Sequence, residues 1–325
     1  MSVSGLPFDD IRALLKNLPQ EDTDASALAI AQNKALSNVF GKFEHQATLM
    51  AWLAGWSGKS PIISRPLVAL FAGSHKTESA LDKDGSAAHH GELETTLQSV
   101  TRLAAGGSPV NQVCAEHDIG LKVFDLALQY PVEDIREDEA LDEKASAATI
   151  GFGMESIAGG IDLLGLSGFG KGARVSSAAI LAILLDKNVE DFLEAGDAQA
   201  IAFAKEAVEA HKSAKDNPLE LLRRLGGREH SALAGGIIAA RTNHIPVVFC
   251  GHVAWSVMAV LNRENAQSCL HCVSASYDDL LNDALSIAHV LNDDTQINDG
   301  SACAQAIAYL KSSAAVHTNT VLNLD

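Results

Sequence analysis

Residues 161–174 read IDLLGLSGFGKGAR, an apolar run that passes into closely spaced glycines. The apolar part, Ile161–Leu166, has the length and composition of a strand buried on both faces of a parallel sheet. A helical pattern follows at Ser176–Leu185. We therefore predict a strand that ends at Leu166, a loop that contains Gly170, and a helix that begins near Ser176.

The same alternation of strand and helix continues on both sides of this segment. Apolar runs of strand length occupy Pro66–Gly73, Gly120–Leu128, Ile161–Gly168 and Ile245–Gly251. Helical patterns occupy Thr149–Ala158, Ala198–His211, Pro218–Leu225 and Ser231–Arg241. This order predicts an α/β fold, with a doubly wound and mostly parallel sheet between two helical layers in a Rossmann-like arrangement.

The two ends of the chain have helical patterns instead. Apolar residues predicted to pack as core recur at helical spacing at Phe8, Ile11, Leu14 and Leu15, and again at Leu49, Trp52, Leu53 and Trp56. An alanine-rich helix is predicted over residues 301–315. We assign residues 1–60 to a small helical domain, 61–290 to the α/β core, and 291–325 to a C-terminal loop and helix that complete the small domain. The polar region 74–94, which includes His89 and His90, is predicted to be an exposed loop.

Composition and charge exclude several classes of protein. The chain is 47% hydrophobic and 20% charged, which is typical of a globular protein. Its formal net charge of −17 repels phosphate backbones and anionic lipids, so we expect neither nucleic acid nor membrane as a partner. No run approaches the roughly 18 apolar residues of a spanning helix, and Asp9 and Asp10 stand where a signal peptide needs basic residues. We therefore expect a cytoplasmic protein. The five cysteines are an odd number spread along a long chain, so reduced thiols are expected.

The glycine loop after Leu166 is a candidate anion site. Glycines allow the backbone to approach a ligand closely, and the start of the next helix offers N–H groups and a positive dipole end. Lys171 and Arg174 would add positive charge. The alternative is a tight turn whose glycines serve only the chain reversal, and the residues of the loop leave both open.

Three other groups could carry chemistry. Cys269, His271 and Cys272 are possible zinc ligands, but a strand would turn only two of them to one face, so we predict no metal site and buried core cysteines. Cys250 and His252 follow an apolar run, where α/β sheets place ligand-binding groups.

Asp299 precedes the alanine-rich helix in a polar turn with Asp293 and Asp294. It is either a general base or a cap of that helix. Local sequence favours the cap.

Several motifs, in this order and spacing, resemble those of the nicotinate-nucleotide:dimethylbenzimidazole phosphoribosyltransferases of cobalamin biosynthesis. They are WLAGW (52–56), FAG (71–73), AAGG (104–107), GLKVFDL (120–126), GME (153–155), PLELLRRLGGRE (218–229) and AAR (239–241). The resemblance covers most of the chain. It implies an α/β sheet domain with a small helical domain from the termini, and a cytosolic homodimer.

The resemblance also implies a reaction and the residues that serve it. In that family phosphoribose moves from nicotinate mononucleotide to a benzimidazole base, and a carboxylate takes the proton of the base. The family motif resembles LGEGTGA, whereas residues 297–303 here read INDGSAC. Asp299 is then the candidate catalytic base, one methylene shorter than the family's glutamate. The candidate contacts to the base are Thr96, Gln98, Gly300 and Ser301. No cofactor is implied.

The phosphate-binding motifs depart further from the family. The family loop resembles GEMGIGNTT, whereas residues 167–175 here read SGFGKGARV. Of the family's HSEPGH motif only the serine remains. The candidate phosphate or nucleotide contacts are Gly170, Lys171, Gly172, Arg174 and Ser274.

The apolar framework therefore matches the family while polar site positions are replaced. This pattern predicts a catalytically impaired paralogue that keeps a weak nucleotide or anion site and pairs with itself or with a family enzyme. The alternative is an active phosphoribosyltransferase with altered base or nucleotide preference, which uses Asp299 as its general base.

Overall fold

A six-stranded parallel sheet forms the centre of the protein. The computed structural model describes residues 7–76, 95–292 and 299–322. Its strands are β1 (Pro66–Ala72), β2 (Gly120–Asp125), β3 (Leu163–Phe169), β4 (Val247–Phe249), β5 (Cys272–Ser276) and β6 (His289–Leu291). They lie in the order β2-β1-β3-β4-β5-β6, and each neighbouring pair is parallel. The predicted α/β class with a mostly parallel sheet is confirmed.

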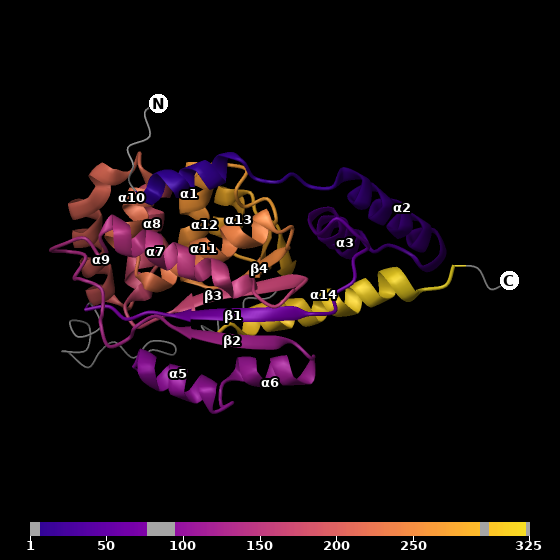
Figure 1. Ribbon diagram of the computed structural model, residues 1–325, viewed down its shortest axis with the longest axis horizontal. Helices are drawn as coiled ribbons and strands as arrows, with labels where there is room; N and C mark the ends of the chain where they lie inside the picture. Colours follow the sequence, from indigo (N-terminus) through magenta and orange to yellow (C-terminus); the bar gives the residue numbers. More distant parts are fainter. Residues whose placement is uncertain (1–6, 77–94, 293–298, 323–325) are drawn as a thin grey trace.

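Helices cover both faces of the sheet because successive strand residues point to opposite sides. Leu67, Ala69 and Phe71 of β1 belong to one apolar cluster, which the helices on one face complete. Those helices are α7 (Glu143–Met154), α8 (Ala173–Leu185), α9 (Ala198–His211), α10 (Pro218–Leu225), α11 (Arg228–Thr242) and α12 (His252–Glu264). Val68 and Leu70 belong to a second cluster on the other face, with α3 (Glu44–Ser57), α5 (Thr96–Ala104), α6 (Pro109–Glu116) and α14 (Ser301–Asn319). Figure 1 shows these two layers.

A helical lobe projects beyond the sheet. It consists of α2 (Thr23–Phe40), α3 and the C-terminal part of α14, which lie together in Figure 1. A buried bond between His317 Nδ1 and Asn33 Oδ1, 2.9 Å long, joins α14 to α2. The helix α13 (Asp279–Leu285) lies between β5 and β6 in the chain.

We assigned residues 1–60 to the small helical domain. Within this range the first described helix, α1 (Pro7–Lys16), packs against the sheet core instead. Its buried residues Phe8, Ile11 and Leu15 join the apolar cluster of the sheet core rather than the helical lobe. Leu14 was predicted as core, but this prediction is wrong, since Leu14 is 43% exposed and the buried face of α1 consists of Phe8, Ile11 and Leu15.

Two boundaries around the glycine loop differ from the sequence prediction. The strand was predicted to end at Leu166, but β3 continues to Phe169 because the parallel ladder with β1 runs on to the pair Ala72–Phe169. The helix was predicted near Ser176, but α8 begins at Ala173. The turn is therefore only Gly170–Gly172.

Two strands were not predicted, and some predicted regions fall outside the described residues. β5 reads CVSAS, which is not a strongly apolar run, and β6 has only three residues. Ser74 and His75, at the start of the predicted exposed loop, are buried. His89, His90, Asp293 and Asp294 lie outside the described ranges. Among the helices of the described residues, none is long and apolar enough to cross a membrane.

Candidate functional site

The carboxyl ends of β1 and β3 meet at the point where the strand order of this sheet reverses. β2 lies on one side of β1 and β3 on the other, so the strand order reverses here, and α/β sheets bind ligands at such points. The two strand ends are in close contact, since Gly73 N donates to Phe169 O at 3.0 Å. A Cβ on Gly170 would lie 2.3 Å from Gly73 O. Only glycine at position 170 permits this approach.

The turn Gly170–Gly172 leads directly into α8. Gly172 is the N-cap residue, with a φ of 90° in the left-handed region that favours glycine. Several backbone N–H groups of the turn already have partners: Ala173 N donates to Gly170 O at 2.9 Å and Val175 N to Gly172 O at 3.1 Å. An anion at this turn would therefore depend on the basic side chains as well as on the helix start.

Basic side chains do gather beside the turn. Lys171 is buried, and Arg174 lies 3.5 Å from the Glu194 carboxylate through its Nη2 atom. Burial, and secondly the positive charge of Arg174, lower the pKa of His252 to about 4. His252 follows β4, so Arg174 after β3 and His252 after β4 lie close enough to interact. The sequence pointed to His252 as a residue at a strand end but could not place it near Arg174.

Thr96 joins the turn from a distant part of the chain. Its Oγ1 accepts a hydrogen bond from Lys171 N at 3.0 Å, which links the start of α5 to the loop after β3. Gln98 is exposed, and its Oε1 accepts from Thr95 N at 2.9 Å in a capping box of α5. Thr96 and Gln98 were both predicted to contact the benzimidazole base. Thr96 lies at the glycine turn, whereas Gln98 lies at the cap of α5 and makes no contact with that turn among the described bonds.

The Asp299 carboxylate contacts the starts of two helices. Oδ2 accepts from Val110 N of α6 at 3.0 Å, and Oδ1 accepts from Ser301 N of α14 at 3.0 Å and from Ser301 Oγ. Gly300 has a φ of 83° and lies against Leu70 of β1. The predicted group Asp299, Gly300 and Ser301 is thus one turn, in which the carboxylate acts as a cap.

Ser274 is held within its own part of the sheet. Its hydroxyl donates to Ser276 O at 2.9 Å and accepts from Asn282 Nδ2 at 3.2 Å. These bonds join β5 to α13 and do not involve the turn after β3.

A buried network that sequence reasoning missed lies beneath the glycine turn. Glu229 Oε1 contacts His75 Nε2 at 2.7 Å and His230 Nδ1 at 2.8 Å, and His230 Nε2 lies 3.0 Å from Ser177 Oγ of α8. Burial raises the pKa of the Glu229 carboxyl, but the two imidazoles outweigh burial and hold that pKa well below its usual value. A Cβ on Gly73 would lie 1.6 Å from Glu229 Oε2, so the network also requires a glycine after β1. The network could have been suspected from Glu229, because this carboxylate ends the motif PLELLRRLGGRE (218–229).

The same network contains the residues best placed to hold a metal. Among the described residues, His75, Glu229 and His230 form the one group of potential ligands whose atoms lie within 4.8 Å of one another. Their contacts at 2.7 and 2.8 Å are hydrogen-bond lengths, so the side chains bond one another directly. Of the predicted alternative ligands, Cys272 Sγ lies 3.6 Å from His271 Nδ1. His271 Nε2 lies 3.1 Å from Ile237 O, and Cys269 donates to Met258 O at 3.8 Å.

Comparisons with known proteins agree on one family. A family model described as phosphoribosyltransferase matches residues 18–322. Similar proteins include two nicotinate-nucleotide–dimethylbenzimidazole phosphoribosyltransferases, from Allorhizobium ampelinum and Agrobacterium fabrum. Each is 42% identical over 98% of this chain, and the match covers 95% and 94% of their respective lengths. A solved structure of the enzyme of that name from Thermus thermophilus matches with a TM-score of 0.77 at 20% identity, over 91% of this chain and 96% of that one. That likeness concerns the fold.

Proposed function

Because this chain belongs to the nicotinate-nucleotide:dimethylbenzimidazole phosphoribosyltransferase family, we propose that it keeps a weak nucleotide or anion site and transfers phosphoribose only slowly. The ligand site would be the turn Gly170–Gly172 with Lys171, Arg174 and Thr96. The acceptor would be a benzimidazole-like base. We further propose that the protein works in the cytoplasm.

The bonding of Asp299 is the observation that carries this proposal. A carboxylate offers about four lone-pair sites. Three of them accept bonds from Val110 N, Ser301 N and Ser301 Oγ. A general base must take a proton from its substrate, and the bonds that begin two helices leave Asp299 only the fourth of these sites to receive it. The shorter side chain of aspartate also reduces the reach of the carboxylate toward a substrate.

The turn after β3 supports the same proposal. Where the family motif has its glutamate, this chain has Gly168. A Cβ at position 168 would lie 2.6 Å from Val253 Cγ1, so the space beside this backbone is filled by α12. Arg174 stands where the motif has a threonine, and it pairs with Glu194 rather than pointing freely into the crevice.

A turnover assay tests the proposal. The full chain and the Agrobacterium fabrum relative would be compared with nicotinate mononucleotide and dimethylbenzimidazole, with product measured by chromatography. We expect this chain to turn over at least about a thousandfold more slowly, by analogy with the loss of preorganised contacts. Isothermal calorimetry with nicotinate mononucleotide would still detect weak binding. Turnover equal to that of the relative would refute the impairment, and no detectable binding would refute the retained site.

The second candidate is an active enzyme with a different base or nucleotide preference. It is favoured by the 42% identity of relatives that carry the enzyme's name over nearly their full length. The same assay with a panel of substituted benzimidazoles, purines and phenols distinguishes the two. Fast turnover with any of these bases, abolished by Asp299→Asn, would support the second candidate.

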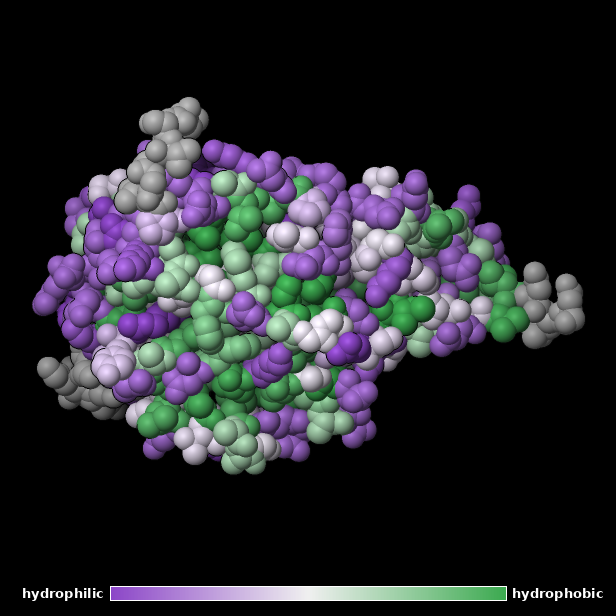
Figure 2. Space-filling model, in the orientation of Figure 1, coloured by the Kyte–Doolittle hydropathy of each residue, from purple (hydrophilic) through white to green (hydrophobic). Residues whose placement is uncertain are grey.

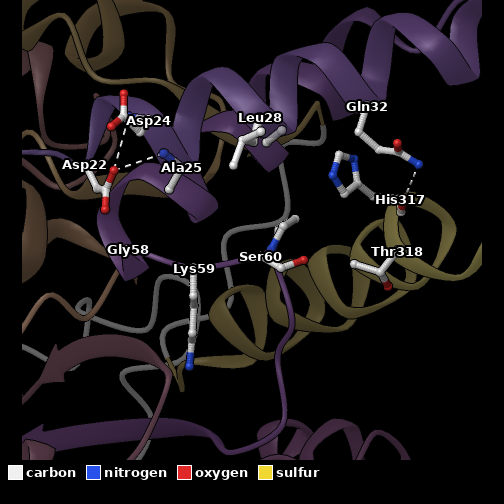
Figure 3. A pocket seen from close by; sticks show the side chains of 12 residues that line it. Asp22, Asp24, Ala25, Leu28, Gln32, Gly58, Lys59, Ser60, His317 and Thr318 are labelled. Carbon is white, nitrogen blue, oxygen red and sulfur yellow. Dashed lines mark hydrogen bonds between the residues drawn. The ribbon is translucent and has the colours of Figure 1, made fainter.

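We also propose that the chain forms a homodimer through its helical lobe. Hydrophobic residues reach the surface there beside polar ones (Figure 2), and Leu28 of α2 is 73% exposed. Leu28 borders a groove of about 620 Å³ between α2, the segment after α3, and the end of α14 (Figure 3). Sedimentation at micromolar concentration should give a molar mass twice the 34.2 kDa of one chain. The Leu28→Asp variant should have a measured mass closer to that of the monomer. A wild-type monomer would contradict this.

A further inference from the structure

Two cysteines from distant parts of the chain meet beneath the Asp299 turn. Cys250 follows β4, and Cys303 lies in the first turn of α14, 53 positions later. Their sulfur atoms are 3.0 Å apart. A disulfide needs about 2.05 Å, so an approach of about 1 Å would join them.

We propose that Cys250 and Cys303 are an oxidation site, which forms a reversible intramolecular disulfide when the protein meets a peroxide. This goes beyond the proposed transferase function and does not depend on it.

The two thiols are placed for different roles. Cys303 donates its S–H to the Cys250 sulfur, and that bond is the main cause that lowers the pKa of Cys250, although burial and Asp299 act in the opposite direction. Burial raises the pKa of Cys303 well above its usual value. Cys250 is 8% exposed and Cys303 is fully buried, so an oxidant reaches Cys250 first. We assign Cys250, the more exposed of the two, as the attacking thiolate and Cys303 as the resolving thiol.

The reaction balances with hydrogen peroxide as the oxidant. The Cys250 thiol first loses its proton to solvent, and the thiolate attacks one peroxide oxygen. The O–O bond breaks, a sulfenic acid forms, and the departing hydroxide takes up a proton from solvent to become the first water. The Cys303 sulfur then attacks the sulfenic sulfur, the S–O bond breaks, and its proton leaves with the oxygen as the second water. Two thiols are oxidised by two electrons, and one peroxide becomes two waters. A dithiol reductant reverses the step.

Two of the other three described cysteines, Cys114 and Cys269, provide internal controls. Burial raises the pKa of Cys269 to about 12, and burial together with the charge of Asp299 raises that of Cys114 to about 11. Neither thiol has the short sulfur contact that joins Cys250 and Cys303. Because thiolates react with peroxide and thiols do not, both should stay reduced.

Peptide mapping of the oxidised full chain tests the proposal. Trypsin leaves Cys250 on peptide 242–263 but puts Cys269, Cys272 and Cys303 together on peptide 264–311. Cleavage before aspartate separates a 299–311 peptide that contains Cys303 alone. After hydrogen peroxide, alkylation in denaturant and digestion, we expect peptides 242–263 and 299–311 to be joined, two hydrogens lighter than their sum. Dithiothreitol should release both.

Variants make the assignment specific. Cys114→Ser should leave the cross-link intact. Cys303→Ala should abolish it and leave a sulfenic acid on Cys250, detectable as a dimedone adduct. The wild-type chain alone can overturn the proposal. It fails if both thiols remain fully alkylatable in peroxide, if Cys250 instead joins another cysteine, or if the link forms only between two chains.

Discussion

Two helices of this protein start in different ways. The turn after β3 is held mainly by contacts of its backbone, whereas the turn before α14 is held mainly by the side chain of Asp299. At Gly170–Gly172 the backbone shape is fixed by close packing on Gly73, and a buried network under the turn supports it. At Asp299 the acidic side chain remains, but its oxygens cap α6 and α14. The glycine turn is therefore held by backbone packing, and the Asp299 turn is held by side-chain hydrogen bonds. If both turns belong to the site that we propose, its shape depends on the backbone at one turn and on a carboxylate at the other.

The largest expected effect comes from removing the support under the glycine turn. Glu229→Ala leaves His75 and His230 without their shared buried partner, so we expect a loss of about 3–5 kcal/mol in the free energy of unfolding. Urea unfolding followed by circular dichroism measures it. Glu206→Ala, at a largely exposed acid that faces Arg136, is the matched control and should change stability by less than about 0.5 kcal/mol. Equal midpoints for the two variants would mean that the network does not support the turn.

A smaller effect is expected at the other turn. Asp299→Ala removes cap bonds from two helices and should cost about 1–2 kcal/mol. Asp299→Asn keeps one carbonyl oxygen as an acceptor and should cost less, yet it cannot act as a base. Asp142→Ala, which uncaps α7 alone, is the control for a single cap. If Asp299→Ala were no more destabilising than Asp142→Ala, the double capping role would be wrong.

The smallest effect concerns charge at the glycine turn. Changing both Lys171 and Arg174 to alanine should weaken binding of inorganic phosphate about tenfold, equivalent to 1.4 kcal/mol. Added salt should weaken binding to the wild type more than to the variant, because screening acts on the removed charges. Calorimetry measures both. Lys187→Ala, at an exposed lysine beyond the end of α8, should leave the affinity unchanged. An unchanged affinity in the double variant would remove these side chains from the anion site.

The parts of the fold that followed from the sequence are those with a local pattern. β1 and β3 are buried on both faces, so each appears as an unbroken apolar run. β6 has only three residues, which is too short to produce such a run, and β5 mixes serine with small apolar residues. The start of α8 was placed three residues late because Arg174 interrupts the apolar pattern although it lies inside the helix.

The site was less accessible to sequence reasoning because its contacts join distant residues. The glycines of the turn were visible as a local motif. The bond from Lys171 N to Thr96 spans 75 positions, and that from His75 to Glu229 spans 154. No periodicity encodes such pairings, since they follow from the order of strands in the sheet. For Asp299 the sequence left two roles open, a general base or a cap of the following helix. The contact with Val110, 189 positions away, shows that the cap extends to a second helix.

The position of α14 has a consequence for how the protein is made. This helix covers Val68, Leu70, Val248 and Ala275 on one face of the sheet, yet it follows all six described strands in the chain. During translation the part of this face that lies under α14 therefore stays uncovered until α14 leaves the ribosome, and uncovered apolar surface makes a nascent chain prone to aggregate. A stop codon in place of Ser301 should yield insoluble protein that depends on chaperones, whereas one placed after Asn319 should not.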